Sequence, residues 1–254
     1  MLGLSEDRII YLDIEALLSL SMSSFASRRK DVRAFLTSYF EKFEQLKIVD
    51  VEKFIYSSWV RNILYFHSGM GDGIRYASAD RLAEEIRVRE ISGEVAELGV
   101  FKGVFAAFLR QIFPDKKLYL FDTFEGFMPS QGEYDKNEFD TYLGDFSNTS
   151  VDYALNTIGD VSNCIVKKGC FPDTAKDIEE AFCFVSLDVD LYQPTLDGLE
   201  YFYPRLSKNG FIMVHDYNST NYRGCRQAIL EFCGRYNICI VPIVDNLGTA
   251  ILTK

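Results

Sequence analysis

The sequence predicts an α/β fold in which a mainly parallel sheet is flanked by helices, with a helical extension before it and an antiparallel hairpin at its end. From residue 94 onward, short apolar runs typical of strands alternate with segments whose apolar residues recur at helical spacing. Polar residues and glycines follow several of these runs, as they do at the carboxyl edge of parallel sheets that bind ligands. We therefore divide the chain into a mostly helical extension, residues 1–74, and an α/β domain, residues 75–254.

Helical spacing dominates the extension. Apolar residues share one face in segments 31–47 and 51–67, and a glycine-rich stretch follows. A further helix is expected at roughly residues 75–90. The extension carries no catalytic motif, so we interpret it as a lid or an oligomerisation arm, and we interpret His67, at a helix end, as structural.

The domain is predicted, in chain order, as strands separated by helices. Apolar runs bounded by Gly, Pro, Asn or Asp indicate strands, and 123–142, rich in glycine and acidic residues, is expected to be a loop. Asp245–Gly248 has the composition of a hairpin turn. The expected strands are 95–98, 118–121, 164–168, 183–187, 211–214, 238–244 and 249–253, and the expected helices are 102–113, 147–158, 174–182, 194–206 and 222–236.

Composition and charge exclude several classes of protein. The formal net charge is −10 and the one short basic run is Arg28–Lys30, so tight binding to nucleic acid phosphates is not expected. No uncharged run approaches the length that crosses a membrane, and the first residues lack the pattern of a secretory signal. The six cysteines form no CxxC pair and occupy apolar positions. We therefore expect buried free thiols and a cytoplasmic protein.

A glycine turn marks the start of the domain. Gly99 and Gly103, with Val100 between them, permit unusual backbone angles and a close approach of helix to strand. Glu97 ends the preceding strand, where a carboxylate can pair with the ammonium group of a ligand. A dinucleotide-binding turn would need a further glycine inside this segment, which is absent, and a simple packing turn is the structural alternative.

A second acidic residue, Asp122, ends the next strand. An acid at this place can accept hydrogen bonds from both hydroxyls of a ribose, although capping the following turn would explain it equally well. Together with Glu97 and the glycine turn, Asp122 and its neighbour Thr123 fit an adenosyl amino acid, which favours S-adenosylmethionine over a nicotinamide cofactor. Gly169 and Phe171, after the third strand, are candidates for the border of the adenine.

Two further strand ends carry polar residues. Asp188 and Asp190 follow an apolar strand, and in extended backbone they share a face. His215 and Asp216 close the adjacent strand. Carboxylates held close together repel unless a cation or a shared proton relieves them, and hard cations such as Mg²⁺ prefer oxygen ligands. His215 is open to three interpretations, as a ligand, a base or a hydrogen-bonded core histidine, and Asp190 alternatively caps the next helix.

These residues stand in segments whose order and content resemble the macrocin O-methyltransferase family, which includes sugar O-methyltransferases of macrolide and aminocoumarin pathways. The resemblance runs from about residue 75 to about residue 230. The segments are Glu97–Gly103, Phe121–Phe127, Gly144–Ser147, Lys168–Thr174, Leu187–Thr195, Tyr203–Gly210 and His215–Tyr217.

The resemblance implies a Rossmann-like class I methyltransferase fold that transfers a methyl group from S-adenosylmethionine to a hydroxyl of a sugar-containing small molecule. It also implies a divalent metal, usually Mg²⁺, held by Asp188, His215 and Asp216, with Asp188 bordering the cofactor as well. Asp190, or alternatively His215, is then the base that takes the hydroxyl proton. The chain differs from the antibiotic enzymes in carrying His215 where they carry Asp, and imidazole is a softer ligand than carboxylate.

Two other functions stay open at this point. One is an NAD(P)-dependent oxidoreductase on the same architecture, against which the missing glycine and Glu97 both argue. The other is a non-catalytic protein that binds S-adenosylmethionine. The aromatic residues of 123–142 are expected to form the acceptor pocket with the extension, and the aromatic helices of the extension favour a homodimer or higher homo-oligomer.

Overall fold

The computed structural model describes residues 72–254. The helices expected over 31–47 and 51–67, and His67, lie outside the described residues. The chain divides into two compact units, of which the second, Ser78–Lys254, holds the fold described below. The expected domain boundary at residues 74 and 75 stays a prediction.

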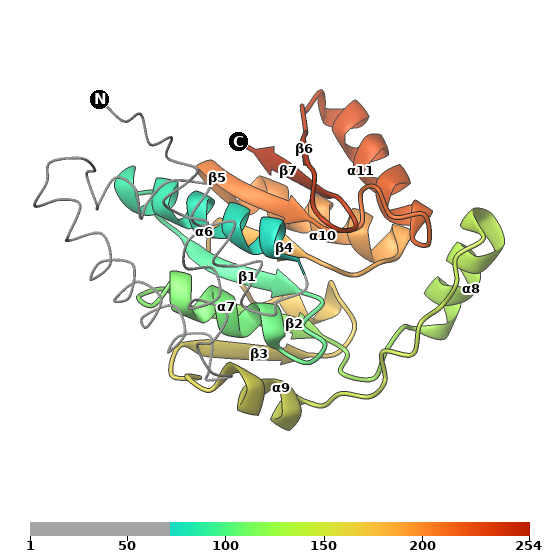
Figure 1. The fold of residues 1–254 in the computed structure, drawn as a ribbon, viewed down its shortest axis with the longest axis horizontal. Coiled ribbons are helices and arrows are strands. Elements are labelled where there is room, and N and C mark those ends of the chain that lie inside the picture. Colours follow the sequence, from blue (N-terminus) through green and yellow to red (C-terminus); the bar gives the residue numbers. More distant parts are fainter. Residues whose placement is uncertain (1–71) are drawn as a thin grey trace, which may run out of the picture. The chain divides into compact units, whose positions relative to one another are not determined.

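A seven-stranded sheet forms the centre of this unit (Figure 1). Its strand order is β3-β2-β1-β4-β5-β7-β6; β3, β2, β1, β4 and β5 are mutually parallel, whereas β7 pairs antiparallel with β5 and with β6. The predicted mainly parallel sheet with a C-terminal hairpin is thus confirmed. The strands are β1 (Glu94–Leu98), β2 (Leu118–Asp122), β3 (Cys164–Lys168), β4 (Phe182–Leu187), β5 (Leu206–Val214), β6 (Val241–Ile243) and β7 (Thr249–Thr253).

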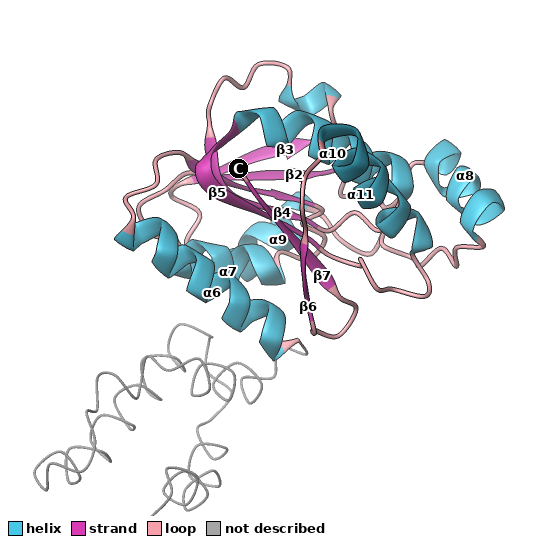
Figure 2. Cartoon of the chain, turned by 90° about the horizontal axis from the view of Figure 1, so that it is seen from above, coloured by secondary structure: helices cyan, strands magenta, loops and turns pink. Residues whose placement is uncertain are grey.

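Helices cover both faces of the sheet. Helix α7 contacts α9, helix α10 contacts α11, and Figure 2 shows these two pairs on opposite faces. This is the arrangement that right-handed crossovers between parallel strands produce. The helices are α6 (Gly73–Val88), α7 (Val104–Ile112), α8 (Pro129–Phe139), α9 (Val151–Ile158), α10 (Tyr192–Arg205) and α11 (Arg223–Tyr236).

The core explains why the central strands are apolar throughout. Every residue of β4 is buried, because helices cover both faces of a parallel sheet. An aromatic cluster under α10 joins Phe121, Phe171 and Phe202, with ring centroids 5.4 to 5.7 Å apart. The cysteines are free thiols as expected, but Cys239 is exposed, so the expectation that all of them are buried is wrong.

Two predictions for connecting segments were wrong. The loop expected at 123–142 contains α8, which begins at Pro129, a favoured first residue of a helix. The helix expected at 174–182 is a short 3₁₀ turn, Asp173–Ala175, followed by coil. The carbonyl of Ala175 accepts from the amide of Ile178 (3.2 Å), three residues on, and from the hydroxyl of Tyr201 (3.0 Å), so a single tight turn and a tertiary contact take the place of a continuing α-helix.

Within residues 72–254, the structure contains no helix with the length and apolar character needed to cross a membrane.

Candidate active site at the carboxyl edge of the sheet

The glycine turn after β1 packs directly on the backbone that follows β4. Gly99 has a φ of 90°, and a Cβ atom there would lie 1.9 Å from the carbonyl oxygen of Asp188. Gly103 has a φ of 78°, and its Cβ would lie 2.7 Å from the carbonyl oxygen of Ala154 in α9. A glycine is therefore needed at position 103 for the turn to pack against α9. A glycine is needed at position 99 for the turn to pack against the loop that carries Asp188.

Asp122 fixes the conformation of this turn. Its Oδ2 accepts hydrogen bonds from the backbone amides of Val100 (2.7 Å) and Phe101 (2.8 Å), and its Oδ1 accepts one from the amide of Phe124 (2.6 Å). These bonds hold Phe101 in the left-handed region, with a φ of 49°. A carboxylate has about four acceptor positions, so the expected bonds to a ribose stay compatible with this role and stay a prediction.

Glu97 lies at the end of β1, beside Ser186 of β4, and is 1% exposed. A carboxylate buried this deeply is costly unless positive charge or hydrogen-bond donors stabilise it. Its place two residues before Gly99 is the place expected for a group that binds a ligand ammonium, and that role stays a prediction.

The other residues predicted to bind the cofactor, Thr123, Gly169 and Phe171, have different structural roles. Thr123 donates to the carbonyl of Gly126 (2.7 Å) and so shapes the loop after β2. Gly169 has a φ of 134°, and its amide donates to the carbonyl of Asp122 (2.9 Å), which places it beside that residue. The ring of Phe171 is buried in the aromatic core, so its contact with an adenine stays a prediction.

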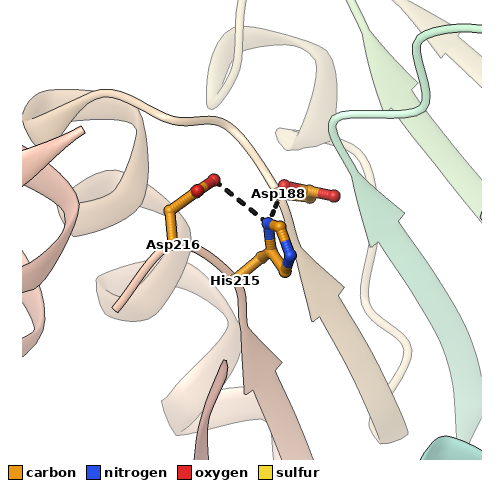
Figure 3. A group of neighbouring side chains, drawn as sticks. All are labelled: Asp188, His215 and Asp216. Atoms are coloured by element: carbon orange, nitrogen blue, oxygen red, sulfur yellow. Dashed lines mark hydrogen bonds and ion pairs between the residues drawn. The ribbon is translucent and has the colours of Figure 1, made fainter. Parts of the chain in front are cut away.

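An imidazole between two carboxylates occupies the ends of β4 and β5 (Figure 3). Nδ1 of His215 lies 3.0 Å from Oδ1 of Asp188 and 3.1 Å from Oδ2 of Asp216. The amide of His215 donates to the carbonyl of Leu187 (2.9 Å), and the thiol of Cys225 donates to the carbonyl of His215 (2.9 Å), so the backbone is fixed on both sides. The three predicted metal ligands are therefore brought together.

Asp216 has the features of a residue held for a ligand. It is buried, its φ is 61°, and its Oδ1 accepts no hydrogen bond from the described residues. One ligand atom from each of Asp188, His215 and Asp216 lies within 4.8 Å of the others. An oxygen- and nitrogen-containing set of this kind suits a divalent cation.

Asp190 adds a third carboxyl group to the cluster. Its backbone lies in the left-handed region, with a φ of 62°. Burial, followed by the negative charges of Asp188 and Asp216, raises the pKa of Asp190 well above its usual range. A carboxylate with a raised pKa is a stronger base than an exposed one.

Sequence reasoning missed two residues near this cluster. Tyr222 precedes α11, and its hydroxyl lies 3.4 Å from the position that a Cβ of Gly144 would occupy. Burial and the charges of Asp190, Asp216 and Asp188 raise the pKa of Tyr222 to about 12. Asp135 of α8 is completely buried. Neither residue belongs to a recognisable spacing, because both come near the site only through the packing of distant segments.

Comparisons with known proteins find relatives that are named methyltransferases. The chain is 27% identical over 200 residues to 8-demethyl-8-(2,3-dimethoxy-alpha-L-rhamnosyl)-tetracenomycin-C 4'-O-methyltransferase of Streptomyces olivaceus, covering 72% of each chain. It is 28% identical over 163 residues to mycinamicin III 3''-O-methyltransferase of Micromonospora griseorubida, covering 58% of this chain and 63% of that one. The fold resembles that of a calicheamicin methyltransferase, with a TM-score of 0.61, 19% identity and coverage of 87% and 91%.

The family assignment rests on a longer match. Residues 32–250 match the sequence profile of the Macrocin-O-methyltransferase (TylF) family. The match extends well before residue 75 and beyond residue 230, so the span expected from the motifs alone was too short. The chain belongs to the macrocin O-methyltransferase family and is an S-adenosylmethionine-dependent O-methyltransferase with the class I methyltransferase fold.

Proposed function

We propose that the enzyme methylates a sugar hydroxyl of a small-molecule acceptor, with a divalent cation held by Asp188, His215 and Asp216, and with Asp190 as the base. The observation that carries this proposal is the convergence of Asp188, His215 and Asp216 at adjoining strand ends, with Asp190 close enough to feel their charges. The backbone carbonyl of Asp188 packs against Gly99 of the glycine turn.

The cofactor is assigned to the edge formed by β1 and β2. Glu97 supplies a buried negative charge for the ammonium group, and Asp122 supplies acceptor positions for the ribose. Gly99, Val100 and Gly103 form the turn that Asp122 orders, which allows a close approach of the backbone. S-adenosylmethionine supplies an electrophilic methyl group on a sulfonium.

The cation is supported by the charge balance of the cluster. Asp188, Asp190 and Asp216 place three carboxyl groups around one imidazole, and a cation relieves their repulsion. The free Oδ1 of Asp216 adds an acceptor that suits a cation. A divalent cation bound there, Mg²⁺ or a softer ion, would hold two sugar oxygens and lower the pKa of a hydroxyl.

The chain's own residues then act on the proton. Nδ1 of His215 lies between two carboxylates, which orients the ring as a ligand and leaves Asp190 as the better base. The hydroxyl proton passes to the carboxylate of Asp190 while the sugar oxygen forms its bond to the methyl carbon and the carbon–sulfur bond breaks.

The acceptor class follows from the relatives. The tetracenomycin enzyme acts, by its name, on a compound that carries a rhamnosyl group. We assign a sugar-containing small molecule as the acceptor of this chain, and no nucleic acid. We further propose a cytoplasmic homo-oligomer in which residues 1–74 act as a lid or an oligomerisation arm.

Release of S-adenosylhomocysteine tests the proposal. The full-length enzyme is incubated with S-adenosylmethionine and a panel of rhamnosides, nucleotide-linked sugars and glycosylated polyketides, with EDTA or with added Mg²⁺ or Mn²⁺. We expect transfer to at least one sugar and its loss in EDTA, with recovery on adding metal. Transfer that is insensitive to EDTA would refute the cation, and tight binding of S-adenosylhomocysteine without transfer to any sugar would favour a non-catalytic binding protein. Titration with NAD gives the remaining control, and no binding is expected.

A further inference from the structure

Helix α8 is attached to the rest of the enzyme through a buried carboxylate. Within α8, all of which the structure describes, the buried residues are Gly132 and Asp135, three positions apart and so on one face. Asp135 is 0% exposed. A surface helix normally docks through an apolar face, so a helix that instead buries an acid depends on that acid for its position.

The partner of Asp135 is the first turn of α10. Both Oδ1 (3.0 Å) and Oδ2 (3.2 Å) of Asp135 accept from the backbone amide of Tyr192, the first residue of α10. The capping residue Leu191 provides no side-chain bond, so Asp135 supplies from another helix the acceptor that an N-cap normally supplies. The partial positive charge of the helix N-terminus favours a carboxylate at this place.

A second helix start encloses the same carboxylate. Gly224 lies in the first turn of α11, and a Cβ atom there would lie 2.2 Å from Oδ1 of Asp135 and 3.0 Å from the ring of Phe139. Aromatic rings complete the contact, since Tyr134 and Phe139 lie 5.8 and 5.6 Å from the ring of Tyr192. Burial raises the pKa of Asp135 to about 6, so the group is ionised in neutral solution.

This attachment lies next to the loop that carries Asp188 and Asp190, the catalytic loop of the proposed function. Tyr192 comes two residues after Asp190 and four after Asp188, and the amide of Leu191 donates to the carbonyl of Val189 (2.6 Å). Figure 1 shows α8 on the side toward which the arrowhead of β1 points, which is the edge that carries the site. Movement of α8 relative to Tyr192 therefore reaches the loop of Asp188 and Asp190 directly.

We propose that Asp135 is a positioning residue for methyl transfer: it holds α8 over the acceptor side of the site and fixes the start of α10 next to the catalytic loop. The acceptor part of this inference rests on the proposed function. The attachment of α8 stands on the hydrogen bonds and burial alone.

Steady-state kinetics of matched variants test the role. Asp135→Ala is expected to raise KM for the sugar acceptor about tenfold or more, with a smaller change in kcat, and to leave the affinity for S-adenosylhomocysteine within about twofold. Asp135→Asn keeps an oxygen for the amide of Tyr192 and is expected to recover most of the loss. Gly224→Ala displaces Asp135 from the other side and is expected to act like Asp135→Ala.

Two controls keep the result specific. Glu138→Ala removes an exposed acid from α8, and Gly234→Ala makes the same substitution as Gly224→Ala on α11 where nothing lies within 4 Å. Both are expected to behave as wild type. An unchanged acceptor KM in Asp135→Ala, or an equal loss of S-adenosylhomocysteine affinity, would overturn the positioning role.

Amide hydrogen exchange gives a readout that needs no acceptor. Peptides covering residues 129–139 are expected to exchange faster in Asp135→Ala and Gly224→Ala than in wild type, while β1 and β4 stay protected. Unchanged exchange would refute the attachment even if no sugar acceptor is found. Faster exchange in an enzyme that methylates no sugar would instead refute the proposed acceptor and retain the attachment.

Discussion

The two edges of the sheet treat charge in opposite ways. At the amino edge, the side chain of Arg110 is 4% exposed, and its guanidinium donates to the carbonyls of Phe113 (3.1 Å) and Lys116 (3.2 Å) and to the carboxylate of Asp160 (3.0 Å). These hydrogen bonds all end on acceptors of the protein, and the carboxylate of Asp160 balances the positive charge of Arg110.

At the carboxyl edge, like charges gather instead. Asp188, Asp190 and Asp216 surround His215, and burial together with the two other carboxylates raises the pKa of Asp190. This arrangement lowers the stability of the folded chain unless a ligand or a proton shared between carboxyl groups compensates it. We therefore propose that the paired cluster, Arg110 with Asp160, serves the fold and that the crowded cluster, Asp188, Asp190, Asp216 and His215, serves ligand binding. The predictions below test that division.

The largest expected effect is on the crowded cluster. Asp188→Asn removes a proposed ligand atom while keeping the shape, and we expect kcat to fall about 10³-fold. Binding of S-adenosylhomocysteine, measured by calorimetry, is expected to persist. Full activity in this variant would end the metal-and-base mechanism.

A substitution in the paired cluster, Arg110 with Asp160, should lower the stability of the protein and leave its catalytic rate unchanged. Arg110→Met leaves several carbonyls and Asp160 without their donor, and we expect the free energy of unfolding to fall by about 3 kcal/mol. Denaturant titration measures the loss, and kcat at low temperature is expected to match wild type. A drop in kcat without a loss of stability would contradict the division between the edges.

His215 sets which cation the crowded cluster prefers. Replacing the imidazole by a carboxylate in His215→Asp makes the ligand set harder, so we expect the ratio of Mn²⁺ to Mg²⁺ affinity to fall about tenfold. The rise in Tm of the cofactor-free enzyme with each metal gives the measurement. An unchanged ratio would show that His215 is not a ligand.

The smallest expected effect concerns Asp135. Its pKa rises from 3.8 to about 6 on folding, so the folded state binds this proton more tightly than the unfolded state. Stability contributed by this group therefore falls as pH rises from about 4 to about 6, and the full cost is present above about pH 6. Between about pH 5.5 and about pH 7.5 we expect wild type to lose about 1 kcal/mol more than Asp135→Asn does.

Denaturant titrations at both pH values provide that comparison. Glu133→Gln, an exposed substitution on the same helix, serves as the control. Its free energy of unfolding should change between the two pH values as that of wild type does. Parallel slopes for wild type and Asp135→Asn would show that Asp135 titrates as it does in the unfolded chain.

The sequence predicted what depends on local pattern and missed what depends on distant contact. Gly99 and Asp188 were visible because strand ends carry a recognisable order of residues, and the sheet brings such ends together. The role of Asp135 was not visible, because its partner Tyr192 is 57 residues away and a lone acid in a polar segment carries no period. The helix expected at 174–182 failed for the same reason, since this segment is fixed by a contact with Tyr201, 26 residues away from Ala175.

The contact of Gly99 with the carbonyl oxygen of Asp188 has a thermodynamic consequence. A shift of the turn that accompanies cofactor binding is transmitted to the loop that carries the proposed metal ligand, because no space separates them. Whatever factor the cofactor imposes on cation affinity, the cation must impose on cofactor affinity. If the proposed cation binds at Asp188, the two ligands are linked reciprocally through this backbone contact, and a side chain at residue 99 would change the coupling by the same factor for both.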